Sequence, residues 1–404
     1  MTRPRAMVHV LYGFFFLMGA ETYVVNPLIP TIGRAMRVDA PAAAITVTAF
    51  VIAYAISAPL VAAVATPRRR PWLVIAGTVM FAVGNLACGV AWTFDVMIAG
   101  RVLAGVGAGL AAPSVWTLLS AMVSDDQRGR VVGYGVAAYG AGQVLGVPLG
   151  AFLAEVVSWR LAFVAIAAGF TVLIPPLVVL LRRRYQSSGS HTPAADQSAP
   201  QLRYAVFGAL VLALLATFFV QAGRLGAYSF VSSIAEMRYS STTNDQGLIG
   251  LAAGLGAIGG SITAGRLCDY LTRHTRSALW ASMGFALIFM AFAIVSFATR
   301  SPILFLVTLV GWCVAGGGFY SAQQVFFSSQ SDTIRQSAIA WNGTVMNIGI
   351  AAGTTLLGHF ALGGTVFIVA MAGLATVGIV MLGASLAVYA RSRNPVPDPL
   401  VAVR

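Results

Sequence analysis

The feature that most constrains this chain is a succession of long apolar runs separated by short polar breaks. An α-helix needs about 20 predominantly apolar residues to cross the hydrocarbon core of a bilayer, and the runs provide roughly twelve such helices. Only 9% of the residues are charged, whereas about a quarter are charged in soluble domains. The sequence therefore predicts an all-α membrane protein that lies in a lipid bilayer.

The expected membrane-spanning segments form two sets of six. They are residues 7–33, 43–65, 72–92, 95–120, 131–156 and 160–181, followed by 205–235, 244–267, 277–297, 302–326, 337–360 and 364–390. A polar stretch rich in Ser, Pro and Ala separates the sets and is expected to be a flexible linker. We expect an N-terminal six-helix bundle (1–183), a cytoplasmic linker (184–202) and a C-terminal six-helix bundle with a short cytoplasmic tail (203–404).

The two sets also resemble each other in sequence. SDDQR at Ser124–Arg128 matches SDTIR at Ser331–Arg335 with an offset of 207, and the same offset places Gly142 on Gly349. Several matches in the same order indicate an internal duplication, which predicts two pseudo-symmetric bundles. In secondary transporters such repeats place the substrate site at their interface, near the membrane midplane. The duplication therefore predicts a transporter.

The arginines predict the orientation of the chain in the membrane. The chain has no lysine, and with both termini inside, eighteen arginines fall in inner segments and five in outer loops. This is the bias of the positive-inside rule, so both termini are expected to be cytoplasmic in a bacterial-type plasma membrane. Because the charge falls in alternate loops, the net charge of +13 is not interpreted as a nucleic-acid-binding surface.

Glu21 lies in the middle of the first apolar segment. A charged carboxylate at that depth costs on the order of 3 kcal/mol, so it should be protonated part of the time or paired with a cation. Burial disfavours the ionised form and a nearby arginine favours it, so such a group can bind and release a proton as its surroundings change. The alternative is a static structural ion pair.

Two arginines also lie within expected spans. Arg101 is in the fourth span. Its side chain either stays buried among the helices or extends its charged end to the outer membrane interface. Gln221, Arg224 and Tyr228 share one face of the seventh helix, which suits an aqueous cavity. We hypothesise that Arg224 shares this cavity with Glu21, either paired with it or with proton and substrate divided between them. The alternative is that Arg224 lies at the outer rim of the membrane, where it would only fix the orientation of its helix.

Polar side chains recur in two later spans. Tyr320, Gln323 and Gln324 lie in the tenth, and Asn342 and Asn347 lie in the eleventh. They are candidate substrate contacts that offer hydrogen bonds and an aromatic ring rather than charge. The alternative is that they form hydrogen bonds between helices.

One stretch carries a family resemblance. Gly133, Gly142 and Gly146 are followed by Pro148 and Gly150. This spacing resembles the fifth-helix motif of the proton-coupled exporters of the major facilitator superfamily. One residue separates the third glycine from the proline, whereas the family usually places the proline directly after it. The glycines are expected to be close-packing sites, and packing two helices closely can seal a gate.

The resemblance extends to other positions. Arg101 resembles the fourth-helix arginine of the family, which implies a role in proton release, and an acidic group in the first span implies proton coupling by Glu21. The loop motif of the superfamily is eroded in the first half and better kept in the second, as Gly265, Asp269 and Arg273. If this loop latches the cytoplasmic gate, Asp269 is expected to matter most. The alternative is a helix cap with topology arginines.

The resemblance to twelve-span drug:proton antiporters and their sugar-efflux relatives covers nearly the whole chain. It implies a monomer that exports a drug-like small molecule by alternating access, as in multidrug resistance, with the proton gradient as energy source and no cofactor or metal. The alternatives are sugar or nucleoside efflux by the same mechanism, or an uncoupled facilitator. One embedded glutamate against two arginines favours neutral or anionic cargo. Isolated histidines and cysteines without metal-ligand spacing argue against an enzyme.

Overall fold

The computed structural model describes residues 3–25, 28–38, 40–66, 68–187, 200–240, 243–331 and 334–393, and within these ranges its regular structure is helical throughout. The helices are α1 (Arg3–Val24), α2 (Ile29–Met36), α3 (Ala40–Val64), α4 (Arg70–Val90), α5 (Phe94–Ser120), α6 (Asp125–Val156), α7 (Trp159–Ser187), α8 (Pro200–Tyr228), α9 (Val231–Tyr239), α10 (Thr243–Arg273), α11 (Leu279–Ala298), α12 (Pro302–Ser328), α13 (Arg335–Gly358) and α14 (Thr365–Arg393). Within the described residues, ten helices are long and apolar enough to cross a membrane, and α1 contains a shorter apolar stretch, Ala6–Thr22. The expected all-α membrane fold is confirmed.

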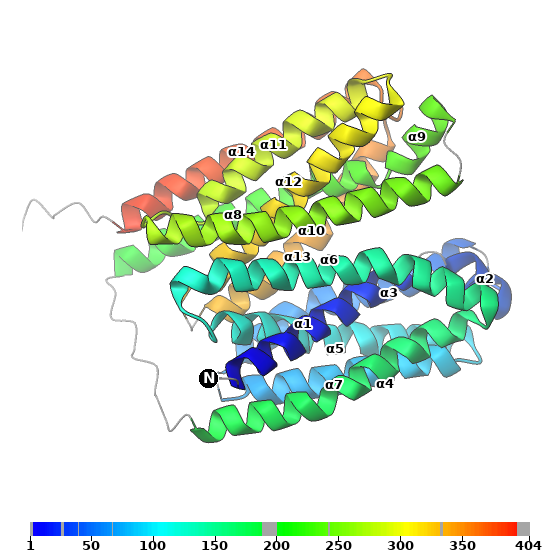
Figure 1. Cartoon of the computed structure of the whole chain (residues 1–404), viewed down its shortest axis with the longest axis horizontal. Coiled ribbons are helices and arrows are strands. Elements are labelled where there is room, and N and C mark those ends of the chain that lie inside the picture. The colour runs from blue at the N-terminus through cyan, green and yellow to red at the C-terminus, as the bar shows by residue number, and fades with distance from the viewer. Residues whose placement is uncertain are drawn as a thin grey trace, which may run out of the picture.

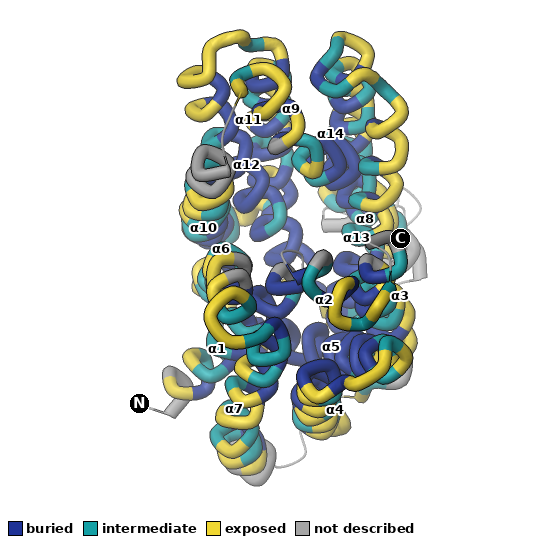
Figure 2. The backbone as a smooth tube through the Cα atoms, turned by 90° about the vertical axis from the view of Figure 1, so that its right-hand side faces the viewer, coloured by how far each residue is buried: buried dark blue, intermediate teal, exposed yellow. Residues whose placement is uncertain are grey.

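The long helices run side by side in two groups (Figure 1). Helices α1–α7 form the first half, in the lower part of the view, and α8–α14 form the second half above it. We call the side at which α1 begins and α14 ends the terminal side, and the side that carries α2 and α9 the far side. Figure 2 looks onto the far side and shows buried residues inside each half and exposed residues on the outer surface. Many of the latter are large and apolar, such as Ile56 and Leu60, as lipid contact requires.

Packing within one half recurs in the other. Helix α1 packs against α6, and α5 packs against α3 and α4; in the second half, α8 packs against α13, and α12 packs against α10 and α11. Between the halves, α6 lies along α10 and α13 lies along α3. These two interfaces are equivalent under the repeat, because α10 corresponds to α3 and α13 to α6. The duplication seen in the sequence is therefore also a structural repeat.

The first expected span, 7–33, is not one helix. Helix α1 ends at Val24, and the short helix α2 begins at Ile29 with a proline in its first turn. Prolines at positions 27 and 30 lack the amide proton that a continuous helix needs, and each disfavours helical geometry in the residue before it. The apolar pattern continues across this break, which is why the sequence alone suggested a single span.

The seventh expected span, 205–235, is also interrupted. Helix α8 ends at Tyr228, and α9 begins at Val231. The amide of Phe230 donates to the carbonyl of Ala227 at 3.1 Å, a turn tighter than an α-helix. The hydroxyl of Ser229 donates to the carbonyl of Leu225 at 3.0 Å, and such back-bonding bends helices. Neither feature is visible as a change in hydrophobicity.

Helix ends on the terminal side extend further than expected. Helix α6 begins at Asp125 rather than at 131, because acidic residues in a first turn stabilise a helix N-terminus. Helix α7 continues to Ser187 and α8 begins at Pro200, so both ends of the expected 184–202 linker are helical. Its central part, residues 188–199, lies outside the described residues. The residues beyond 393 also lie outside them.

Candidate functional site

A cavity of about 70 Å³ lies between the two halves, in the middle of the bundle. Side chains from α1, α3, α5 and α6 line it on one side, and side chains from α12 and α13 line it on the other. The lining residues are Phe15, Met18, Thr22, Phe50, Val51, Tyr54, Ala112, Trp116, Tyr139, Tyr320, Gly343, Met346 and Asn347. Because both halves contribute, any movement of one half against the other must change this cavity.

Aromatic rings dominate the lining. Phe15 stacks on Trp116 with ring centroids 3.8 Å apart, which joins α1 to α5 at the cavity wall. The Tyr139 hydroxyl lies 3.2 Å from the Thr22 hydroxyl, and Asn347 donates to the carbonyl of Gly343 at 2.8 Å. Among the described residues, none that lines the cavity carries a charged side chain. The cavity therefore combines aromatic faces with a few neutral hydrogen-bonding groups.

A buried ion pair lies beside this cavity. The Arg101 guanidinium on α5 donates to Oε1 of Glu21 on α1, and both residues are at most 1% exposed. Arg101 also donates from Nε to the carbonyl of Thr46 at 2.9 Å and lies over the Phe50 ring, 4.6 Å from its centroid. The second oxygen of Glu21, Oε2, has no hydrogen-bond partner among the described residues. Arg101 is therefore anchored by three contacts with two other helices, α1 and α3, whereas among the described residues only one oxygen of the Glu21 carboxylate has a partner.

Sequence position links the pair to the cavity. Glu21 is adjacent to Thr22 and three residues after Met18, and both of these line the cavity. Helix α6 approaches α1 at this level because Gly142 and Gly146 have no side chain. A Cβ at Gly146 would lie 2.5 Å from the Ala20 carbonyl oxygen. At both glycines the backbone of α6 packs closely against α1.

The remaining members of the α6 motif have different surroundings. Gly150 faces Val24 of α1, whereas Gly133 faces α10 of the other half, where an added Cβ would lie 2.7 Å from the Ser261 carbonyl oxygen. Pro148 lies inside α6 on an exposed surface. The motif therefore serves two contacts, one within the first half and one between the halves.

Arg224 lies in the second half, on α8. Its Nε donates to Oε1 of Gln221 at 2.7 Å, so the two residues share a face as their spacing suggested. The guanidinium packs against α12 at Gly316, one helical turn before the cavity residue Tyr320. The ion pair of Glu21 is made with Arg101. That Arg224 and Glu21 divide proton and substrate stays a prediction.

Only two of the second-half candidates, Tyr320 and Asn347, line the cavity. Tyr228 packs edge-on against the buried Trp312 ring, with centroids 5.9 Å apart. Asn342 accepts a hydrogen bond from Thr217 at 3.0 Å and donates to Gln324 at 3.2 Å. Asn342 and Gln324 thus link α8, α13 and α12 by hydrogen bonds, which is the alternative to substrate contact that the sequence left open.

Gln323, the other amide of this stretch, is fully buried on α12. Neither of its side-chain polar atoms has a hydrogen-bond partner among the described residues. Buried amides are nearly always hydrogen-bonded. An arrangement of the halves that supplies partners for Gln323 would therefore be stabilised relative to this one.

Charged residues hold the halves together on the terminal side. Asp269 of α10 is 3% exposed and accepts a hydrogen bond from the backbone amide of Arg130, at 3.0 Å, in the first turns of α6. Backbones are close here because Gly265 faces Gly129, whose carbonyl oxygen would lie 2.5 Å from an added Cβ. A carboxylate at a helix N-terminus is favoured by the helix dipole. Asp269 is therefore placed to stabilise contact between the halves.

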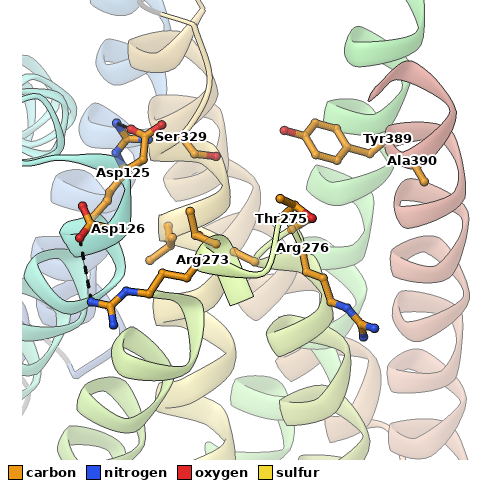
Figure 3. A pocket seen from close by; sticks show the side chains of 13 residues that line it. Asp125, Asp126, Arg273, Thr275, Arg276, Ser329, Tyr389 and Ala390 are labelled. Atoms are coloured by element: carbon orange, nitrogen blue, oxygen red, sulfur yellow. Dashed lines mark ion pairs between the residues drawn. The ribbon is translucent and has the colours of Figure 1, made fainter. Parts of the chain in front are cut away.

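A larger pocket lies on the terminal side, away from the central cavity. Its volume is about 830 Å³, and Asp125, Arg276 and Tyr389 are among the residues that line it. Figure 3 shows Arg273 extending from the second half toward Asp126 of the first half, and their charged atoms are 3.9 Å apart. Both side chains are about half exposed, so this pair contributes little.

On the equivalent side of the bundle, α13 is held to α3, α4 and α5 by hydrogen bonds. Gln336 accepts from Nε of Arg70 at 3.0 Å and donates to the hydroxyl of Ser114 at 2.8 Å. Nearby, Thr344 donates to the carbonyl of Ala55 at 3.0 Å. All of these contacts lie between the middle of the bundle and the terminal side. They occupy the region where the first-half loop motif is eroded.

Sequence reasoning missed the first-half lining of the cavity. Phe15, Met18 and Thr22 follow helical spacing on α1, and Tyr54 and Tyr139 are phenols in the middle of apolar helices. A buried tyrosine hydroxyl needs a hydrogen-bond partner. A tyrosine far from either membrane interface is thus the signal that could have identified this wall.

Comparison with known proteins agrees with this architecture. The family model described as Major Facilitator Superfamily matches residues 11–354. The chain is 25% identical over 378 residues to the "Uncharacterized MFS-type transporter YwfA" of Bacillus subtilis (strain 168), covering 93% of this chain and 89% of that protein. It is 27% identical over 276 residues to "Multidrug resistance protein 1" of the same organism, covering 68% and 69%.

A solved structure has the same fold. The crystal structure of the human organic anion transporter MFSD10 aligns with a TM-score of 0.74 at 16% identity, over 95% of this chain and 100% of that one. The family match spans most of the chain, and the relatives are multi-pass membrane transporters rather than enzymes. The chain belongs to the Major Facilitator Superfamily.

Proposed function

We propose that this protein is a proton-coupled secondary transporter that exports a drug-like small molecule by alternating access. The observation that carries the proposal is the Glu21–Arg101 pair. It is buried, it lies one residue from the cavity lining, and one carboxylate oxygen has no hydrogen-bond partner among the described residues. Protonation of Glu21 would remove its charge and release Arg101, which changes the contacts among α1, α3 and α5.

Cavity size supports a cycle with more than one arrangement of the halves. Pockets for drug-sized ligands are typically about 300–1,000 Å³, whereas this cavity has about 70 Å³. Four of its lining residues belong to the second half, so separation of the halves on the terminal side would enlarge it. The present arrangement corresponds to a state from which cargo has been expelled.

The arginine distribution supports a sidedness for this state. If the terminal side is cytoplasmic, then the Asp269 and Gln336 contacts close the cytoplasmic end of the bundle. Arg101 then lies toward the outer side, since it is in the second turn of α5 as counted from the far side. The bacterial relatives support a bacterial plasma membrane.

The lining favours a drug-like cargo over a sugar. Sugars present many hydroxyl groups, and recognising them requires a comparable number of polar partners. Here the wall is mostly aromatic and apolar, and Asn347 is the only side-chain amide among the described lining residues. The relative named for multidrug resistance points the same way.

The test is transport into inside-out membrane vesicles energised by a pH gradient. Radiolabelled chloramphenicol, a fluorescent dye and a labelled sugar are offered to wild type and to Glu21→Gln. The proposal expects uptake of at least one compound that stops when an ionophore collapses the gradient and is lost in Glu21→Gln. Glu155→Gln is the matched control, because Glu155 is exposed. Uptake that ignores both the gradient and Glu21→Gln would mean an uncoupled facilitator.

A further inference from the structure

The central cavity also carries information about the charge of its cargo, and this inference rests on the proposed function. The wall, as far as the described residues form it, includes six aromatic side chains and no charged one. An aromatic cavity can attract a cation through the faces of its rings or can stack against a neutral aromatic molecule. The surrounding charges decide between these two possibilities.

The Phe50 ring, which lies beside the ion pair, is already in contact with a cation. The Arg101 guanidinium lies over the Phe50 ring, 4.6 Å from its centroid. It fills one face of this wall residue and places a positive charge directly behind it. Glu21 compensates that charge through its contact with Arg101. Glu21 is therefore not placed to act as the counter-ion of a cationic cargo.

A second positive charge lies close to the wall that the second half contributes. Arg224 packs against α12 at Gly316, which is four residues before Tyr320, and residues with this spacing occupy the same helix face. Among the charged side chains buried at this level in the described ranges, two arginines stand against one glutamate. The formal sum is one positive charge. A permanent cation in the cavity would thus meet net repulsion in a region of low dielectric constant.

The polar groups of the wall are neutral and can both donate and accept hydrogen bonds. Tyr54, Tyr139 and Tyr320 supply three phenol groups, two from the first half and one from the second. Gly343 leaves room for the Tyr54 hydroxyl, which would lie 2.8 Å from an added Cβ. A flat ring bearing neutral polar substituents satisfies both the aromatic faces and the phenols. We propose that the cargo is an uncharged aromatic compound with hydrogen-bonding substituents, and that Tyr54 and Tyr320 bind it from opposite halves.

The test compares three ligands with the same ring and different charge. The purified full-length protein in lipid nanodiscs is titrated with 4-nitrobenzyl alcohol, 4-nitrobenzoate and 4-nitrobenzyltrimethylammonium, with binding followed by calorimetry. Empty nanodiscs correct for partition into lipid. The neutral alcohol is expected to bind about tenfold or more tightly than the ammonium compound. Nitroaromatic quenching of Trp116 fluorescence, lost in Trp116→Phe, reports that binding occurs in the cavity.

Variants locate the interaction. Tyr54→Phe and Tyr320→Phe remove one hydroxyl each and are expected to weaken binding of the alcohol about three- to tenfold. Tyr270→Phe is the matched control, because Tyr270 is 58% exposed, and its affinity should be unchanged. Equal or tighter binding of the ammonium compound overturns the inference. So does tighter binding of the benzoate, or absence of binding by all three ligands.

No proton gradient is present in this experiment, so its result is independent of coupling. Selective binding of the alcohol together with gradient-independent transport would leave this inference standing and remove the proposed coupling. Gradient-driven transport together with preferred binding of the ammonium compound would do the reverse.

Discussion

The Glu21–Arg101 pair makes an energetic prediction that needs no knowledge of the cargo. Arg101→Gln leaves the fully buried Glu21 carboxylate without its cation, and breaking a buried pair in this way costs about 3–5 kcal/mol. It also removes the hydrogen bond to the Thr46 carbonyl and the contact with Phe50. Glu21→Gln is expected to cost less, because Arg101 keeps both of those contacts and an amide oxygen can still accept from it.

The losses of stability caused by the two substitutions should not be additive. In the double variant both residues are neutral amides, so no charge is left buried without a partner. We expect it to be at least as stable as Arg101→Gln alone, with a coupling free energy of about 2 kcal/mol or more. Arg101→Gln alone should lower the apparent melting temperature by roughly 5 °C or more.

The assay is thermal unfolding of the purified protein in detergent, followed by tryptophan fluorescence. Arg300→Gln and Glu155→Gln serve as controls at exposed positions, where changes should stay within about 0.5 kcal/mol. Additive losses of stability from Glu21→Gln and Arg101→Gln would show that the two side chains do not stabilise each other. The contact between Glu21 and Arg101 would then contribute no coupling free energy, which would refute the prediction.

Three further outcomes are expected. Asp269→Asn removes the charge that accepts a hydrogen bond from the Arg130 amide, so the terminal side should open more often. Maleimide labelling of a cysteine introduced as Ala62→Cys should then become several-fold faster. Asp95→Asn on the far side is the control and should leave the labelling rate unchanged. Gln336→Ala breaks the bridge between α4, α5 and α13 and should accelerate the same labelling, and unchanged labelling in both variants would refute this account of the closed side. Exchange of an uncharged cargo for protons moves net charge, so a potassium diffusion potential alone should drive uptake into proteoliposomes; uptake indifferent to the potential would contradict a neutral cargo.

Much of the fold follows from the sequence because apolar length and arginine placement respond to the bilayer itself. A run of about 20 apolar residues needs no tertiary context to predict a spanning helix. The duplication also gave the correspondence of Gly142 with Gly349, and both face an equivalent neighbour, Phe16 in one half and Phe218 in the other. The break before Ile29 was not anticipated because the apolar pattern continues across the two prolines that cause it. The break before Val231 was not anticipated because it depends on backbone hydrogen bonding within a segment that stays apolar.

The site could be predicted only in part. Buried charge is costly in a membrane, so Glu21 and Arg101 were conspicuous by type alone, and the structure places them in contact. The first-half wall of the cavity was missed because Phe15 and Trp116 are indistinguishable in sequence from other apolar residues of a spanning helix. Which face of α5 meets α1 depends on helix rotation, and only packing against several neighbours fixes that.

The buried amides show the opposite difficulty. Asn342 and Gln324 are polar residues in the middle of spans, which fits a ligand contact and an interhelical hydrogen bond equally well in sequence. The partner decides, and here the partner is another helix: Thr217 of α8 contacts Asn342. Residue type identifies where polar groups are needed, whereas geometry alone shows what they bind.

The most direct test of the central claim separates coupling from movement of cargo. Purified wild type and Glu21→Gln are reconstituted into proteoliposomes and compared in two assays with the same compound, identified from the vesicle screen. We expect Glu21→Gln to lose accumulation driven by an imposed pH gradient but to keep exchange of labelled for unlabelled cargo without a gradient. Accumulation by Glu21→Gln at the wild-type level would contradict the claim that this carboxylate carries the coupled proton.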